Sequence, residues 1–219
     1  MSFADTIVSV NDTIPRVNLS SPLESLLKRT DAAVLTVLSR TDERLTGRQV
    51  ARLANSSTPA NVRLSLLRLA DVGVVTVMPR SDAVLYSANR EHLLWPAIQI
   101  ALDAETRLIE RIRAMTLRHG FTTFTTVVLY GSIARGDGDS DSDVDLLVVQ
   151  AREGALREAY LDYLREDVRK WTGNRVQIFD ASPAELRSLK ESGDPLFANW
   201  MREGRLVVGD PLETLVGDA

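Results

Sequence analysis

The sequence contains no cysteine and only two histidines among its 219 residues. Without cysteine, the chain has no disulfide framework, no thiolate metal site and no thiol nucleophile. His92 and His119 stand at opposite ends of one predicted helix, and neither has neighbours of the metal-binding kind. We therefore assign the two histidines no role, and cysteine chemistry is excluded.

Long hydrophobic runs are also lacking. No apolar stretch approaches the length of a membrane span, and the first residues lack the basic-then-apolar pattern of a signal peptide. Hydrophobic residues make up 44% of the chain and charged residues 26%, which is ordinary for a globular protein with a full core. We expect a soluble, cytoplasmic protein without membrane contacts.

The net charge of −4 conceals a difference between the two halves of the chain. Residues 21–92 carry ten Lys and Arg against seven Asp and Glu, whereas residues 120–219 carry eleven against eighteen. This asymmetry predicts two units with different partners. We divide the chain into an N-terminal arm (1–20), a first domain (21–92), a linking helix (93–119) and a second domain (120–219).

The first domain shows three helical segments followed by a hairpin. Apolar spacing predicts a helix from Pro22 to about Arg40. A second helix is predicted in 45–54, where Thr46 precedes Gln49 in a capping-box pattern. A third is predicted from Thr58, with a proline at its first position, to Gly73. Two strands, 74–78 and 84–88, follow around a polar turn.

This order of elements resembles a winged helix-turn-helix domain. Such domains place the second helix of the motif in the major groove of double-stranded DNA. The candidate DNA contacts are Ser57, Thr58, Asn61, Arg63 and Arg68, with Arg80 at the tip of the wing. Winged helices also serve as protein-interaction modules, so a surface that binds protein is the alternative.

Residues 91–119 form a helical pattern with an apolar stripe that includes Leu94, Ile98 and Ile112. We favour one long helix whose stripe packs into a core. The same stripe would also support the seam of a homodimer.

The most unusual segment is Leu129–Val149, "LYGSIARGDGDSDSDVDLLVV", which has five aspartates between Asp137 and Asp145. The first three belong to a predicted polar loop, where solvent relaxes their repulsion. Asp143 and Asp145 instead begin an apolar strand and point to the same face of it. Two anions held together need a counter-charge, and carboxylate oxygens favour Mg²⁺ or Mn²⁺.

A Gly-Ser turn precedes this strand. Glycine at 131 lets the backbone approach a ligand closely, and a helix that begins at Ser132 presents N–H groups to an anion. The Ser132 hydroxyl and the Arg135 charge add to this predicted phosphate site. A phosphate cradle beside two metal-binding carboxylates is what phosphoryl or nucleotidyl transfer requires.

The pattern of Gly-Ser, Arg-Gly and Ser-Asp-x-Asp-Leu on a strand resembles the DNA polymerase β-like nucleotidyltransferase superfamily, in particular its minimal nucleotidyltransferase branch. The resemblance implies an α/β (α+β) domain with a small mixed sheet over residues 120–219. It implies a nucleoside triphosphate (NTP) held at Gly131 and Ser132. It also implies Mg²⁺ or Mn²⁺ held by Asp143 and Asp145, which would be the catalytic residues.

Members of this superfamily usually supply a third carboxylate from the next strand, and here that stretch reads "RVQIF". Gln177 stands where the acid is expected, and it brings neither charge nor a base. Asp180 lies three residues further on, which strand alternation places on the opposite face. Loss of a general base typically lowers the rate ~10²–10⁴-fold.

Three functions follow from these observations. The first is an enzyme that transfers a nucleoside monophosphate (NMP) to a hydroxyl on RNA, protein or a small molecule. The second is a DNA-binding transcriptional regulator whose second domain binds nucleotide or a partner without efficient catalysis. The third, implied by the resemblance, is an antitoxin that pairs with a small helical toxin. The intact pair Asp143 and Asp145 favours the enzyme, and Gln177 favours the regulator.

Overall fold

The computed structural model describes residues 16–55, 58–118, 125–150 and 154–217. Helices and two small sheets make up this part of the chain, so the fold is of the α+β class. The described residues divide into two compact units. One contains residues 18–114 and 135–139. The other contains residues 16–17, 115–134 and 140–217, apart from the gaps given above. No helix in the described ranges is long and apolar enough to cross a membrane.

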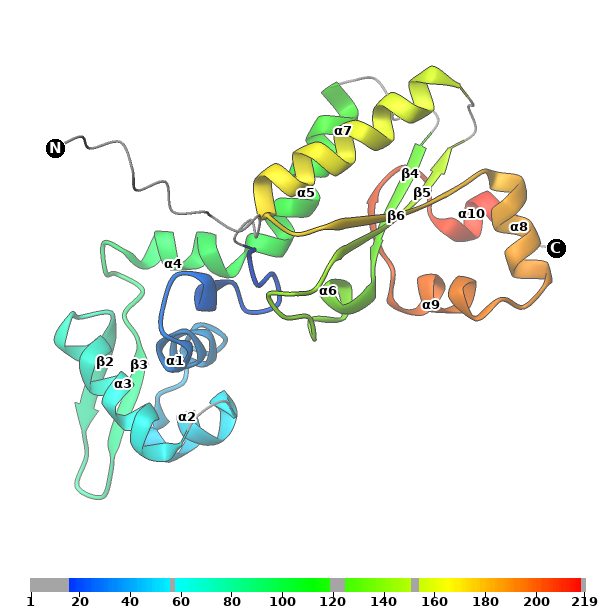
Figure 1. Ribbon diagram of the computed structural model, residues 1–219. Helices are drawn as coiled ribbons and strands as arrows, with labels where there is room; N and C mark the ends of the chain where they lie inside the picture. The colour runs from blue at the N-terminus through cyan, green and yellow to red at the C-terminus, as the bar shows by residue number, and fades with distance from the viewer. Residues whose placement is uncertain (1–15, 56–57, 119–124, 151–153, 218–219) are drawn as a thin grey trace, which may run out of the picture. The chain divides into compact units, whose positions relative to one another are not determined.

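In the described residues, the first unit holds helices α1 to α4, most of α5 and a three-stranded antiparallel sheet in the order β1-β3-β2 (Figure 1). Its elements are η1 (Pro22–Ser25), α1 (Arg29–Ser39), β1 (Leu45–Thr46), α2 (Gly47–Ala54), α3 (Pro59–Asp71), β2 (Val75–Pro79), β3 (Val84–Ala88), α4 (Trp95–Leu102) and α5 (Ala104–Arg118), whose residues 115–118 belong to the second unit.

Side-chain caps define where α2 and α3 begin. The Gln49 N–H donates to the Thr46 hydroxyl at 3.2 Å, and the Thr46 N–H donates to the Gln49 side chain at 2.7 Å. This reciprocal pair is the predicted capping box. The Thr58 hydroxyl accepts the Asn61 N–H at 3.3 Å, with Pro59 at the first helical position. Both predicted helix starts are confirmed.

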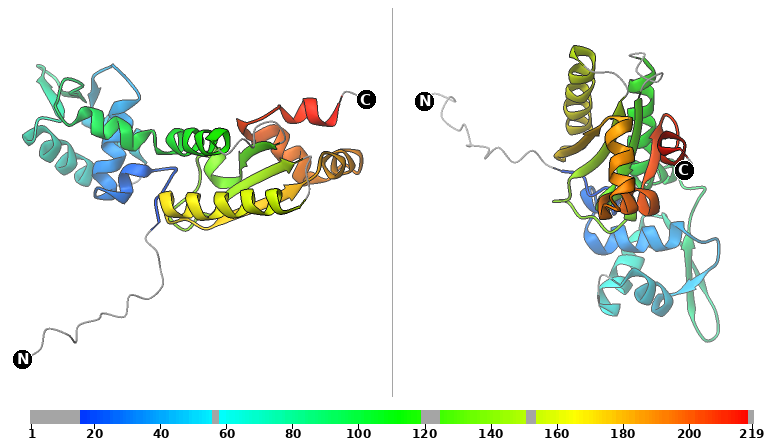
Figure 2. Two further views of the ribbon diagram at one scale, coloured as in Figure 1. Left: turned by 90° about the horizontal axis from the view of Figure 1, so that it is seen from above. Right: turned by 90° about the vertical axis from the view of Figure 1, so that its right-hand side faces the viewer.

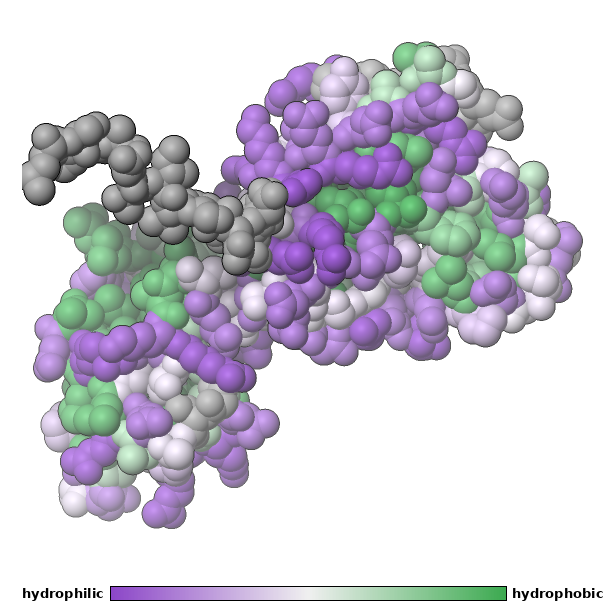
Figure 3. Space-filling view, viewed as in Figure 1, coloured by the Kyte–Doolittle hydropathy of each residue, from purple (hydrophilic) through white to green (hydrophobic). Residues whose placement is uncertain are grey.

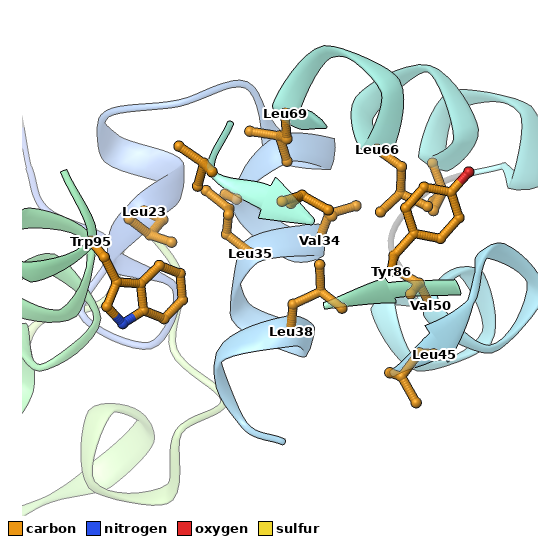
Figure 4. Close-up of a cluster of buried hydrophobic side chains, with 14 residues drawn as sticks. Leu23, Val34, Leu35, Leu38, Leu45, Val50, Leu66, Leu69, Tyr86 and Trp95 are labelled. Atoms are coloured by element: carbon orange, nitrogen blue, oxygen red, sulfur yellow. The ribbon is translucent and has the colours of Figure 1, made fainter. Parts of the chain in front are cut away.

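One hydrophobic core holds the helices against the sheet (Figure 4). Val34 and Leu38 of α1, Val50 of α2 and Leu66 of α3 are fully buried. These apolar positions recur at helical spacing, so each helix turns one face into a common interior.

Two predicted helices are wrong in extent. The segment 22–40 contains the short 3₁₀ turn η1 and then α1, because Lys28 is extended, with a ψ of 139°. The single helix predicted over 91–119 is two helices. α4 ends at Leu102, and the Asp103 carbonyl accepts the Arg107 N–H in the first turn of α5. Backbone capping at these two positions overrides the apolar periodicity.

The second unit contains a four-stranded mixed sheet in the order β6-β5-β4-β7. β4 pairs antiparallel with both β5 and β7, and β5 pairs parallel with β6. The elements are β4 (Thr125–Tyr130), α6 (Gly131–Arg135), β5 (Val144–Gln150), α7 (Ala155–Thr172), β6 (Val176–Ala181), α8 (Pro183–Glu191), α9 (Pro195–Glu203), β7 (Arg205–Val208) and α10 (Leu212–Val216).

Helices cover both faces of this sheet. α7 lies on one side, and α8, α9 and α10 lie on the other (Figure 2). The second face buries Val128, Leu147 and Val149 against Leu186 and Trp200. The helix predicted at Ser132 is present as α6, and the apolar strand predicted at Asp143 and Asp145 is present as β5.

α7 is amphipathic. Its buried side includes Leu164 and Val168, and the side toward the viewer in Figure 3 is mostly hydrophilic. The buried Tyr160 hydroxyl lies 2.8 Å from the Thr116 hydroxyl, and burial raises the pKa of Tyr160 to about 12. Tyr160 is therefore a neutral core residue that joins α7 to the end of α5.

Candidate functional site

The site begins where β4 ends. β4 runs to Tyr130, and the chain then turns through Gly131 into the short helix α6 (Figure 1). Gly131 has a φ of +76°, in the left-handed region that only glycine adopts without strain. α6 has five residues, so its dipole is small, and a phosphate role at this turn rests on the backbone of Gly131 and the hydroxyl of Ser132.

The Asp145 carboxylate lies directly against Gly131. A Cβ built on Gly131 would overlap the Asp145 Oδ2 and come within 3.0 Å of its Cγ. Glycine is thus required here for two independent reasons, the backbone angle and the close approach. The contact places one of the predicted carboxylates beside the Gly-Ser turn.

The sheet register fixes the two acids relative to their neighbours. Asp145 is opposite Tyr130 on β4 and beside Gln177 on β6. Asp143 precedes β5 by one residue, and its side chain is 15% exposed. Residues two apart along a strand share a face, so Asp143 and Asp145 project from the same side of the sheet.

Two side chains hold Asp143: Gln177 of β6, and Arg175, which directly precedes this strand. The Arg175 Nε donates to its Oδ1 at 3.1 Å, and the Gln177 Nε2 donates to its Oδ2 at 2.7 Å. Each carboxylate oxygen therefore accepts a hydrogen bond from the β6 segment. Gln177 lies beside the two acids, at the position where a third carboxylate was expected, and it acts there as a donor.

Asp180, the other residue considered for the third position, lies elsewhere. It pairs with Val148 in the register of β5 and β6, and it forms a 2.7 Å ion pair with Arg157 of α7. No bulge interrupts β6 between Gln177 and Asp180, so the two side chains stay on opposite faces. Asp180 therefore does not lie on the face of the sheet that carries Asp143 and Asp145.

The backbone that precedes Asp143 is tied to the loop between α7 and β6. The fully buried Asn174 donates its Nδ2 to the Ser142 carbonyl at 2.9 Å, and the Val144 N–H donates to the Arg175 carbonyl at 2.8 Å. Arg16 also donates to the Asp141 carbonyl at 3.1 Å. These bonds fix the start of β5 although several carboxylates repel one another nearby.

An aromatic cluster lies beside Asp145. Tyr130 and Phe179 contact Trp200 edge-on, with ring centroids 5.9 and 4.9 Å apart. Burial, followed by the nearby Asp145 charge, raises the pKa of Tyr130. The tyrosine is therefore a neutral hydroxyl beside the site. Sequence reasoning missed it, although its place directly before Gly131 was a usable signal.

Arg135, predicted to add positive charge, forms a 3.2 Å ion pair with Asp137 in the acidic loop. Both side chains are exposed, at 41% and 62%. Solvent weakens such a pair, so the bond to Asp137 contributes little to holding Arg135 in place.

The donor set at the two acids fits Mg²⁺. Within the described residues, no group of three His, Cys, Asp or Glu side chains is placed to hold a metal. Asp143 and Asp145 thus offer two carboxylates, beside the amide of Gln177. Mg²⁺ in proteins is usually held by one or two carboxylates, with substrate phosphates and water as its other ligands. The residues present therefore suit a cation that arrives with a nucleotide.

The residues predicted to contact DNA lie mostly on the outside of the first unit. Thr58, Asn61, Arg63 and Arg80 are exposed, and Ser57 lies outside the described residues. Leu64 and Leu67 of α3 are also exposed, at 61% and 45%. The outer face of α3 thus mixes polar and apolar side chains.

Arg68 has a structural partner. Its Nε donates to the buried Asp31 of α1 at 3.1 Å, and the Ser65 hydroxyl donates to the same carboxylate. The bond joins α1 to α3 and satisfies a charge that would otherwise be buried alone. Arg68 is therefore a stabilising residue of the helix pair, and its predicted role as a DNA contact is less favoured than that of Arg63.

Comparison with known proteins agrees with the geometry of the second unit. Residues 118–192, about a third of the chain, match the family model of the nucleotidyltransferase domain. A search of curated proteins finds no match to the chain. The matched segment runs from the end of α5 through α8 and contains Gly131, Ser132, Asp143, Asp145 and Gln177. The match supports nucleotidyl transfer as the general chemistry of this segment.

Proposed function

We propose that the chain transfers NMP from an NTP to a hydroxyl acceptor with Mg²⁺, and that residues 21–92 bind double-stranded DNA as a winged helix. One observation carries the catalytic part: the Asp145 carboxylate lies against Gly131 at the Gly-Ser turn, on the same face as Asp143. Two carboxylates beside a glycine turn suit a triphosphate and its cation.

Each residue has a distinct role in this proposal. Asp143 and Asp145 hold the cation, which when bound neutralises charge on the phosphates. Gly131 admits a phosphate close to the backbone, and the Ser132 hydroxyl donates a hydrogen bond to it. Arg135, which is exposed and forms an ion pair with the exposed Asp137, offers a further charge. Gln177 holds Asp143 in place but takes no proton.

The test is label transfer. The protein is incubated with each of the four NTPs, labelled on the α-phosphate, together with Mg²⁺ and total RNA or a cell extract. We expect label to become covalently attached to one acceptor class. With Asp143→Asn or Asp145→Asn, transfer should fall to background while thermal unfolding shows a folded protein. Equal transfer by these variants would disprove the assignment.

A second candidate function follows from Gln177. Its side-chain N–H donates to Asp143, and the position supplies no general base. The chain would then be a DNA-binding regulator, or an antitoxin, whose second domain binds nucleotide or a partner without efficient transfer. Binding of NTP and Mg²⁺ without any label transfer, alongside salt-sensitive DNA binding, would favour this reading.

The DNA-binding part rests on the exposed Arg63 near the start of α3 and on the excess of basic residues in 21–92. We expect Arg63→Ala to weaken binding to double-stranded DNA and to reduce the slope of log K against log salt by ~1 if the side chain contacts a phosphate. Fluorescence anisotropy over a range of salt concentrations measures both quantities.

The control for this prediction is Arg187→Ala. Arg187 is exposed on α8, in the other unit, and the substitution removes the same charge. It should leave the slope unchanged. Equal loss of binding in the two variants would indicate a general charge effect, and no loss in Arg63→Ala would favour a protein-binding surface.

A further inference from the structure

The Asp143 carboxylate is paired with a positively charged side chain. The Arg175 guanidinium forms an ion pair with its Oδ1 at 3.1 Å, while Gln177 donates to the other oxygen. The two partners differ in environment, because the Asp143 side chain is 15% exposed and the Arg175 side chain is 69% exposed. A mostly buried acid is thus neutralised by an arginine that extends mostly into solvent.

The backbone determines this pairing. The Arg175 carbonyl accepts the Val144 N–H at 2.8 Å, and Asn174 binds the Ser142 carbonyl at 2.9 Å. Residues 174–175 are therefore fixed on both sides of Asp143. The guanidinium stands at the end of a long flexible side chain, so it can leave the carboxylate without disturbing this frame.

A divalent cation and a guanidinium cannot both bind the same carboxylate without repelling each other. A metal held by Asp143 must therefore compete with Arg175. Release of the arginine costs little once another cation takes its place, because the Arg175 side chain is already 69% exposed and returns to solvent. The freed guanidinium starts beside the carboxylates that hold the cation, and phosphate oxygens are ligands that arginine binds strongly.

We propose that Arg175 is the resident counter-cation of Asp143, that a metal–nucleotide complex displaces it, and that it then binds the phosphates of that nucleotide. The inference rests on the proposed function, since it assigns a residue to the same site. It predicts effects of opposite sign: Arg175 opposes binding of the metal alone and favours binding of the metal with nucleotide.

The experiment uses the full chain and two titrations. Mn²⁺ alone is titrated by electron paramagnetic resonance, and Mg²⁺ with the best-bound of the four NTPs by calorimetry. Arg175→Met keeps the aliphatic stem and removes the charge. We expect this variant to bind Mn²⁺ ~2- to 5-fold more tightly than the unsubstituted chain. It should bind the Mg²⁺–nucleotide complex ~10-fold more weakly.

The matched control is Arg165→Met. Arg165 of α7 also forms a 3.1 Å ion pair with an aspartate, Asp162, and is also exposed. Its removal should change neither affinity. Thermal unfolding shows whether each variant is folded, and Arg175→Lys, which keeps the charge, should restore Mn²⁺ affinity toward the original value.

The outcomes separate this inference from the proposed function. In one outcome, the unsubstituted chain binds Mn²⁺ and Asp143→Asn does not. If Arg175→Met then binds Mn²⁺ no more tightly than the unsubstituted chain, only the inference is overturned. Tighter Mn²⁺ binding with unchanged nucleotide affinity overturns its phosphate-binding part. If the unsubstituted chain binds neither Mn²⁺ nor Mg²⁺–nucleotide, the proposed function and the inference both fail.

Discussion

Gln177→Asp is expected to raise the rate of nucleotidyl transfer ~10²–10⁴-fold, the contribution that a positioned general base typically makes. Gln177 is beside Asp145 in the parallel register and donates to Asp143 at 2.7 Å. A carboxylate at this position would be the third beside Asp143 and Asp145, and it could accept a proton from the acceptor hydroxyl. The measurement is label transfer to the acceptor found with the unsubstituted chain, or to total RNA if that chain shows none.

The matched control is Gln177→Asn. Asparagine has the shape of aspartate without its charge, so it separates the effect of a shorter side chain from that of a base. We expect Gln177→Asn to transfer no faster than the unsubstituted chain. Equal rates in Gln177→Asp and Gln177→Asn would show that a missing third carboxylate does not limit this site. A Gln177→Asp variant that unfolds at a markedly lower temperature would point instead to repulsion among three acids.

Much of the fold follows from local sequence signals. Thr46 with Gln49, and Thr58 with Pro59, cap α2 and α3 where the pattern predicts, because a cap involves residues within one turn. The predicted Gly-Ser turn lies directly after β4, which is a β-rich run that ends at Tyr130. The placement of Asp143 and Asp145 on one face also follows from period two alone.

The surroundings of the acids depend on contacts between distant residues. The family resemblance identifies Gln177 as the third position, but only the parallel pairing of β5 with β6 shows that its amide and Arg175 both bind Asp143. The ion pair between Asp180 and Arg157 of α7 likewise joins residues that are far apart in the sequence. Likewise, the periodicity of 91–119 cannot reveal the break at Asp103, since both helices keep the same apolar spacing.

Gly131→Ala is expected to weaken Mg²⁺–nucleotide binding and transfer ~10²-fold, the cost of misplacing a catalytic group by about 1 Å. The new Cβ would overlap the Asp145 Oδ2 and lie 3.0 Å from its Cγ and 3.2 Å from its Cβ. Because three atoms of the side chain are crowded, rotation of the carboxylate alone does not relieve the overlap. Asp145 must move with its backbone or leave the face that it shares with Asp143.

Gly136→Ala provides the control, because Gly136 has nearly the same backbone angle, φ +77° against +76°, with no atom within 4 Å of its added Cβ. Both substitutions incur the left-handed strain of ~1–2 kcal/mol. Only Gly131→Ala displaces a carboxylate, so calorimetry should show a large loss of nucleotide affinity for that variant alone. If the two variants lose affinity equally, backbone strain accounts for the effect, and the contact between Gly131 and Asp145 does not position the acid for its ligand.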